Sequence, residues 1–228
     1  MPGGFTKTRF VLRALLVCQT WALPLANTHA QECRKTSSNG VRLIMKFEGF
    51  KHHSYRCPAN KLTIGAGHLI KKNDDCLSAL VGSSFDEENL ELSTDEIERL
   101  LQCDLRKTEE AVLRNVLVPL NQFQFDTLVS FTFNLGARNL ARSTLLRLLN
   151  EKHYDKAFDQ LVRWRFASGR VLQGLLKRRF VELFIARNSL DVDFLEARYA
   201  RIHWPDLRES LQQEAQRVAT DYLSQPNG

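Results

Sequence analysis

The chain lacks the features that would point to a metal site, a cofactor site or a membrane-spanning domain. Its five cysteines include no CxxC pair, so the spacing typical of a zinc site is missing, and no metal or cofactor is expected. Its mostly apolar stretch at residues 14–26 is shorter than the roughly 20 residues that a membrane-spanning helix needs. No internal repeat and no low-complexity tract occurs. What remains is the composition of an ordinary globular protein.

The length of 228 residues suits one domain with appendages, and such a chain can bury a core without help from a metal. The formal net charge is +6, and it would fall to +3 without residues 1–30, which hold three basic and no acidic residues. A charge this small and scattered does not predict nucleic-acid binding. We expect a monomer.

Residues 1–30 have the pattern of an export signal. Basic residues precede the apolar stretch at 14–26, and Thr28 and Ala30 provide small residues before a cleavage point at Gln31. We expect an exported protein, periplasmic or secreted, without stable membrane insertion after cleavage. Retention of the segment as a signal anchor is the alternative.

Export changes the interpretation of the cysteines. Cys18 would leave with the signal, and Cys33, Cys57, Cys76 and Cys103 would remain. Four cysteines in an oxidising compartment allow three complete pairings, and the sequence does not choose among them.

A helix is predicted from about Ser38 to Glu48. Val41, Ile44 and Met45 recur at helical spacing, and Glu48 continues that stripe. The helix is therefore expected to aim this carboxyl group toward the apolar side. Burial disfavours the charged form of a carboxyl group, so Glu48 is expected to hold a proton and to be able to donate it.

The segment at residues 54–70 predicts short strands and turns, marked by Pro58 and Asn60, and no other strand is expected. Ser93 and Glu96 form a predicted capping box at the start of a long helix. The remaining predicted helices are Asp95–Leu117, a buried central helix at Gln122–Leu135 ended by Gly136, a short helix capped by Ser143, Tyr154–Trp164, and Val171–Arg187 with a basic face.

This outline is α+β and mostly helical, with a small β-containing lobe joined to a helical lobe. We divide the chain into residues 1–30, a main domain at 31–189, and a C-terminal helical extension at 190–228. The extension has a short amphipathic stripe that includes Val218 and Tyr222, and we expect it to pack on the main domain. A helix that faces a membrane or a partner is the alternative.

The segment EGFKHHSYRCPANKLTIGAGH resembles the catalytic segment of bacteriophage-type lysozymes, which have E-G, then Y-x-D/C-P, then T-I-G-Y-G-H. Relative to Glu48, Cys57 follows after nine residues, Thr63 after fifteen and His68 after twenty. The similarity continues through LSTDEIERLLQCDL, VPLNQFQFDTLVSFTFNLG and GLLKRRFVE, and so covers about residues 38–187. One departure is Ala66, which replaces the tyrosine of the family motif.

The resemblance implies a lysozyme-like fold with a small β-hairpin lobe and a helical lobe around a cleft. It also implies cleavage of the β-1,4 bond between N-acetylmuramic acid and N-acetylglucosamine in peptidoglycan glycan strands. By position, Glu48 is the general acid, and Thr63 and Cys57 position the attacking water. The other residues matched by position are Asn134 as a substrate contact, and His68, Arg178 and Arg179 as structural residues.

Cys57 has three interpretations: a catalytic thiol, a member of a disulfide, or an inert packing residue. Burial would raise the pKa of the thiol and keep it neutral. A bond to Cys33 or to another cysteine would make the enzyme inactive until it is reduced.

Two other functions stay open, a non-catalytic relative that binds the cell wall and a lytic transglycosylase. Membrane disruption by the C-terminal helix is a third.

Overall fold

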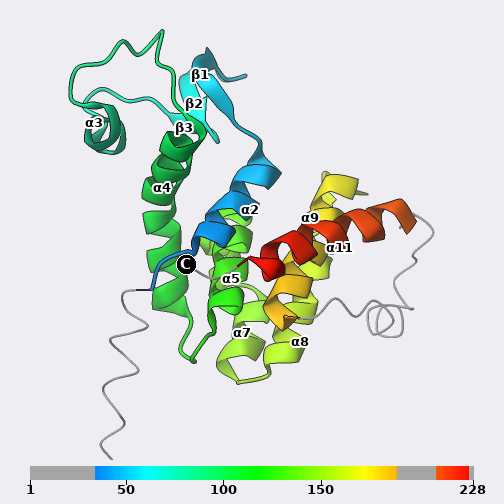
Figure 1. The fold of residues 1–228 in the computed structure, drawn as a ribbon. Helices are drawn as coiled ribbons and strands as arrows, with labels where there is room; N and C mark the ends of the chain where they lie inside the picture. Colours follow the sequence, from blue (N-terminus) through cyan, green and yellow to red (C-terminus); the bar gives the residue numbers. More distant parts are fainter. Residues whose placement is uncertain (1–33, 189–208, 226–228) are drawn as a thin grey trace, which may run out of the picture.

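The structure is a computed structural model that describes residues 34–188 and 209–225. The predicted export signal, Cys33 and residues 189–208 lie outside the described residues. Within the described ranges, helices make up most of the molecule, and a small antiparallel sheet lies at one end (Figure 1). No helix of these ranges is both long enough and apolar enough to span a bilayer.

Helix α2 (Ser38–Glu48) has the bounds that the sequence predicts. The Ser37 side chain caps it by accepting a hydrogen bond from the Gly40 amide, and Gly49 ends it with a φ of +70°. Gly40 also permits a close approach, because a Cβ there would lie 2.8 Å from Cγ of Asp126. The start of α2 is therefore pressed against helix α5 (Gln122–Leu135).

The sheet consists of β1 (Lys51–Arg56), β2 (Leu62–Gly65) and β3 (His68–Leu69), in that order and antiparallel. Tyr55 lies opposite Thr63 in the register of β1 and β2. The loop between these strands closes when the Asn60 amide donates to the Cys57 carbonyl at 2.7 Å. Asn60 has a φ of +57°, a conformation that asparagine tolerates better than most residues. This loop is what positions Cys57.

Helix α3 (Asp75–Val81) and the long helix α4 (Thr94–Asn115) follow the sheet. The predicted capping box is present at the start of α4, where Ser93 and Glu96 satisfy each other's backbone amides. A disulfide between Cys76 and Cys103 ties α3 to α4. Because α4 runs from the sheet to the helical bundle, it connects the two ends of the molecule (Figure 1).

The central helix α5 also has its predicted bounds, with Phe125, Leu128 and Phe131 completely buried and Gly136 at its end. Most of the helical bundle packs around it. The other elements before the break in the described residues are α6 (Ala137–Ala141), α7 (Thr144–Asn150), α8 (Tyr154–Phe158), η1 (Asp159–Arg163), β4 (Phe166–Ala167), β5 (Arg170–Val171) and α9 (Gln173–Arg187).

Three expectations from the sequence are corrected here. The segment predicted as one helix from residue 154 to 164 is α8 followed by the 3-10 helix η1. The expectation of a single strand region is wrong, because β4 and β5 pair as a small hairpin around Gly169, whose φ is +75°. The predicted basic face of α9 is also wrong, because Arg178 and Arg179 are buried, at 4% and 0% exposure.

The C-terminal helix α11 (Glu209–Ser224) lies across α9 and reaches α2 (Figure 1). Its inward residues Ala215, Val218, Ala219 and Tyr222 belong to the same hydrophobic core as the rest of the molecule. The amphipathic stripe is therefore explained by packing within the chain.

Candidate functional site

Glu48 is the last residue of α2, and it lies at a turn rather than inside the apolar core. Its side chain is 28% exposed, and Oε1 accepts a hydrogen bond from Nη1 of Arg178 at 2.6 Å. The expectation that the apolar stripe buries this carboxyl is therefore wrong. The buried stripe of α2 ends at Met45, and Glu48 extends toward α9 instead.

Arg178 of α9 holds Glu48 from a buried position. Its Nε donates to Glu182 Oε1 at 3.2 Å, and its Nη2 donates to the Ser130 carbonyl at 3.1 Å. The guanidinium also lies over the ring of Phe47, at 4.9 Å from the ring centre. Because guanidinium donors are fixed in one plane, these contacts set the direction from which Arg178 meets the Glu48 carboxylate.

Arg179 extends the same cluster to the end of α5. Its Nη2 donates to Asn134 Oδ1 and to Glu182 Oε1, each at 3.1 Å, and the side chain is completely buried. Its Nε lies 3.1 Å from Glu182 Oε2 as an ion pair without hydrogen-bond geometry. Burial lowers the pKa of Arg179 to about 10, so the group is still charged at neutral pH. Asn134, the predicted substrate contact, is therefore tied to this cluster through its carbonyl oxygen.

Cys57 and Thr63 meet at the loop between β1 and β2. The Cys57 thiol is free and half-buried, and Thr63 is only 2% exposed. Hydrogen bonds from the backbone of Lys61 and Ala59 and from the Thr63 side chain lower the pKa of the Cys57 thiol, and they outweigh partial desolvation. The sequence argument expected burial to raise this pKa, and the polar turn reverses the direction.

The disulfide between Cys76 and Cys103 removes both of these residues as partners for Cys57. Of the pairings left open by the sequence, only one with a cysteine outside the described residues, such as Cys33, stays untested. Within the described residues, Cys57 is a free thiol.

His68 is set apart from these groups, between two carboxylates. Its Nδ1 lies 2.8 Å from Asp104 Oδ1 of α4, and its Nε2 lies 3.0 Å from Asp74 Oδ2 at the N-cap of α3. Burial by itself lowers the pKa of His68, but the hydrogen bonds and charges of Asp104 and Asp74 raise it overall. The imidazole thus connects β3, α3 and α4. No group of three or more His, Cys, Asp or Glu side chains suited to a metal occurs within the described ranges.

The structure places these four predicted site residues in two separate groups. Glu48 and Asn134 are connected through the arginine–glutamate cluster of α9, whereas Cys57 and Thr63 contact each other in the sheet. Residues 49–50 form the short link between the end of α2 and β1, so both groups are placed by the same stretch of chain.

The sequence did not predict the contacts among three residues of the site, Arg178, Glu182 and Ser130. Ser130 Oγ donates to Glu182 Oε1 at 2.7 Å, so Ser130 and Arg178 both contact the buried carboxylate of Glu182. A signal did exist: Glu182 follows Arg178 by four residues and Arg179 by three, the spacings at which side chains meet on a helix. The spacing could therefore have predicted a buried glutamate beside two arginines, but it could not have predicted that Arg178 contacts Glu48.

Comparison with known proteins identifies the family of this chain. The family model described as phage lysozyme matches residues 45–182, which include Glu48, the sheet and most of α9. The chain belongs to the phage lysozyme family. The matched range ends before α11, so that helix lies outside the part that defines the family.

Relatives of this phage lysozyme family member include phage endolysins. The endolysin of Bacillus phage B103 is 34% identical over 160 residues, which cover 68% of this chain and 56% of the relative. The endolysin of Salmonella phage P22 is 35% identical, over 63% of this chain and 91% of the relative. The SAR-endolysin of Escherichia phage Mu is 35% identical, over 62% and 75%. The chain thus spans little more than half of the B103 endolysin.

Solved structures confirm the lysozyme-like fold. A mutant of P22 lysozyme matches with a TM-score of 0.59 and 32% identity, covering 68% of this chain and 99% of that one. The muramidase domain of SpmX from Asticaccaulis excentricus matches with a TM-score of 0.54 and 33% identity, covering 67% and 97%. The α+β, mostly helical fold class predicted from the sequence is therefore confirmed.

Proposed function

We propose that this phage lysozyme is an exported muramidase that hydrolyses the β-1,4 bond between N-acetylmuramic acid and N-acetylglucosamine in peptidoglycan. The observation that carries the proposal is Glu48. It is a partly exposed carboxyl group, fixed from behind by the buried Arg178 at 2.6 Å, within the range matched by the family. Fixed placement of a proton donor is what cleavage of a glycosidic bond requires.

In the proposed reaction, Glu48 donates a proton to the glycosidic oxygen as the bond to the anomeric carbon breaks. The contact with Arg178 uses Oε1, and we assign the proton to Oε2. With this arrangement Oε1 accepts from Arg178 whether or not Oε2 is protonated. After transfer the carboxylate is negative, and the guanidinium that faces it stabilises that charge. Asn134 is proposed as a substrate contact near the same cluster.

Water completes the reaction from the sheet side. Because Cys57 is half-buried and Thr63 almost fully buried, the sulfur is the atom proposed to contact the water. The Thr63 hydroxyl donates to the Lys61 carbonyl at 3.0 Å, and the Cys57 amide donates to the same carbonyl, so Thr63 fixes the turn that carries the sulfur. The lowered pKa of Cys57 favours a thiolate, which accepts a hydrogen bond from water better than a neutral thiol does. As the water oxygen attacks the anomeric carbon, its proton passes to the Cys57 thiolate, which leaves a hydroxyl group on that carbon.

The test is peptidoglycan digestion by purified protein. Glu48→Gln keeps the size and an oxygen for Arg178 but cannot donate the proton, so the rate should fall by about 10² to 10⁴-fold. Glu98→Gln, at an exposed ion pair with Arg42, serves as the matched control and should keep full activity. Mass analysis should find reducing ends. Anhydro ends, which are lighter by one water, would instead identify a lytic transglycosylase, and binding without any product would identify a non-catalytic relative.

The role of Cys57 is tested separately with Cys57→Asp and Cys57→Ser. Aspartate supplies an anionic acceptor and should keep activity within about tenfold, whereas serine should lose about 10²-fold. Full activity in Cys57→Ser would rule out the thiolate. If reductant raises the activity of wild type but not of Cys33→Ser, the two cysteines form a reversible bond in the oxidised chain.

Export through residues 1–30 is part of the proposal, supported by the signal-like pattern and by a SAR-endolysin among the relatives. A mature protein that begins at Gln31 would establish cleavage, and a membrane-bound full chain would establish a signal anchor.

A further inference from the structure

Helix α11 lies outside the family match and yet is built into the core beside the site. Within the described residues it packs against both α9 and α2. Helix α2 ends at Glu48, and α9 carries Arg178, so α11 touches both helices whose side chains form the Glu48–Arg178 pair. The relative placement of these two helices fixes the position of the Glu48 carboxyl.

The attachment to α2 begins at a buried carboxylate. Tyr222 of α11 donates its hydroxyl to Asp126 Oδ2 at 2.6 Å, and the same carboxylate accepts from the amide and hydroxyl of Ser37, the cap of α2. Gln122 also donates to Asp126, at 2.8 Å. Asp126 is completely buried and Tyr222 is 4% exposed. Burial raises the pKa of Asp126, and four hydrogen bonds converge on its carboxyl group, so this buried network joins α11 to the cap of α2.

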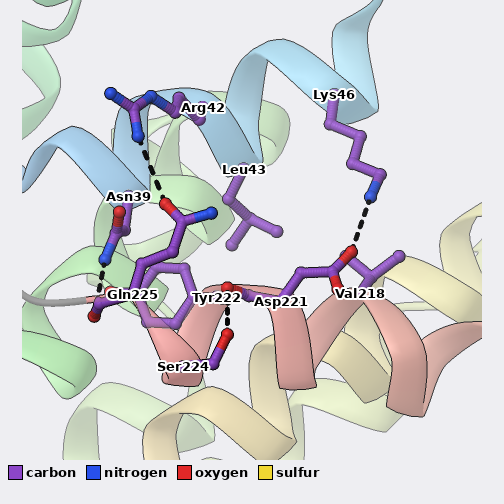
Figure 2. Close-up of a pocket in the computed structure, with 9 residues that line it drawn as sticks. All are labelled: Asn39, Arg42, Leu43, Lys46, Val218, Asp221, Tyr222, Ser224 and Gln225. Atoms are coloured by element: carbon purple, nitrogen blue, oxygen red, sulfur yellow. Dashed lines mark hydrogen bonds and ion pairs between the residues drawn. The ribbon is translucent and has the colours of Figure 1, made fainter.

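Further contacts follow along α2 toward Glu48 (Figure 2). The Asn39 side chain donates to the Gln225 carbonyl at 3.3 Å, and Arg42 donates to the Gln225 side chain at 3.2 Å. Lys46, two residues before Glu48, lies 3.6 Å from Asp221. These polar contacts line a small surface pocket of about 250 Å³ between the two helices. The contacts of Arg42 and Lys46 are exposed and individually weak, whereas Asn39 is buried, and together they extend the attachment along the helix.

The attachment to α9 lies next to the site as well. Lys177 forms an ion pair with Glu214 of α11, and the following residue is Arg178. Val218 and Ala219 of α11 are buried in the shared core. Helix α11 therefore restrains α2 from its cap to its last turn, and it restrains α9 next to Arg178 and Arg179.

We infer that α11 is a positioning element of the site: by bridging α2 and α9 it holds Glu48 in register with Arg178, and Tyr222 is its principal positioning residue. The inference rests on the proposed function, since Glu48 is the proton donor that is positioned. Tyr222 touches neither substrate nor reacting atoms. It acts through Asp126 and Ser37 on the direction of α2.

The test compares Tyr222→Phe with wild type on peptidoglycan fragments. The phenyl ring keeps the edge contact with Phe123, and only the hydroxyl is lost. If the hydroxyl positions α2, kcat should fall about fivefold to twentyfold while KM stays within about twofold, because misplacement of a reacting group affects the chemical step more than binding. Hydrogen exchange at the last turn of α2, where the Gly49 amide bonds to the Met45 carbonyl, should become faster.

Two controls separate positioning from general loss of stability. Thr220→Ala changes an exposed residue of the same helix and should leave kcat and exchange unchanged. Leu149→Val weakens the buried core at α7, which packs on α8, and should lower Tm without changing kcat below the melting range. A fall in kcat in Leu149→Val equal to that in Tyr222→Phe would overturn the inference.

Glu48→Gln is measured in the same series. If it is inactive and Tyr222→Phe keeps both kcat and the exchange rate of wild type, the positioning role is wrong and the proposed function stands. If Glu48→Gln keeps full activity, the proposed function fails. In that case, hydrogen exchange at the last turn of α2 still tests whether Tyr222 restrains this helix. An exchange rate in Tyr222→Phe equal to that of wild type would show that it does not.

Discussion

The sheet side and the helical side of the molecule each contain a cluster of charged side chains that ends at a partly exposed carboxyl group, Asp104 in one and Glu48 in the other, but the two clusters differ in their balance of charge. In the sheet cluster, His68 lies between Asp74 and Asp104, and all three groups are satisfied by one another and by the cap of α3. In the helical cluster, Arg178 and Arg179 share the single carboxylate of Glu182, and the second positive charge faces Glu48.

This difference separates a structural cluster from one that serves a site. Both clusters are buried and both contain shifted pKa values, so neither burial nor titration distinguishes them. What distinguishes them is the sign of the surplus charge: two carboxylates share one imidazole around His68, whereas two guanidinium groups share the buried carboxylate of Glu182 and one of them faces Glu48. We therefore expect changes in the helical cluster to affect both stability and activity, and changes in the His68 cluster to affect stability alone.

The largest effect is expected from Glu182→Gln. The amide removes the only negative charge between two buried arginines, and breaking a buried ion pair in this way costs about 3–5 kcal/mol in the free energy of unfolding. Activity per folded molecule should also fall, because a neutral amide holds Arg178 in its orientation toward Glu48 less strongly than the carboxylate does. Urea unfolding and peptidoglycan digestion measure the two effects. Glu151→Gln, which removes an exposed pair with Arg147, is the control and should cost under about 1 kcal/mol.

An intermediate effect is expected when the disulfide is removed by Cys76→Ser with Cys103→Ser. The bond joins residues 27 positions apart, and closing a loop of this size stabilises a fold by about 3 kcal/mol. The Tm should therefore fall, while kcat at a temperature below the melting range should stay within about twofold. A large loss of kcat in the folded variant would show that the region around His68 also controls the chemistry and would break the comparison.

The smallest effect is expected from His68→Gln, and it depends on pH. Loss of a charged imidazole between Asp74 and Asp104 should cost about 1–3 kcal/mol in the free energy of unfolding. Because the folded pKa of His68 is raised, its contribution is complete below the unfolded value of about 6.5 and is lost as the pH rises through the folded value.

Thermal melts from pH 5 to pH 9 measure this dependence. Wild type should lose more stability than His68→Gln over the alkaline part of the range, so the two curves should approach each other. Parallel curves would mean that His68 is not charged in the folded protein.

The sequence anticipated the parts of the fold that depend on neighbouring residues. The bounds of α2 and α5, the capping box of Ser93 and Glu96, and the cap at Ser143 all follow from contacts within three or four residues. The family resemblance also placed Cys57 and Thr63 in one loop region, where the structure joins them. The short hairpin β4–β5 was missed because two-residue strands leave almost no periodicity to detect.

The sequence failed where a side chain's environment is decided by distant chain. Helical periodicity assigned Glu48 to an apolar face, but the group that meets it, Arg178, lies 130 residues away. The basic face predicted for α9 failed for the same reason, since a glutamate on that helix and residues of α5 draw the arginines inward. The direction of the Cys57 pKa shift likewise depended on backbone donors of a turn.

By itself, the sequence determined which segments are helical, where they are capped, and which family the chain resembles, because hydrogen bonds and apolar periodicity act over a few neighbouring residues. Only the tertiary structure decided that Glu48 faces a guanidinium, that Cys76 pairs with Cys103, and that α11 spans α2 and α9. These contacts join segments that lie far apart in the chain, and a charged group's neighbours are set by how the packed helices bring such segments together.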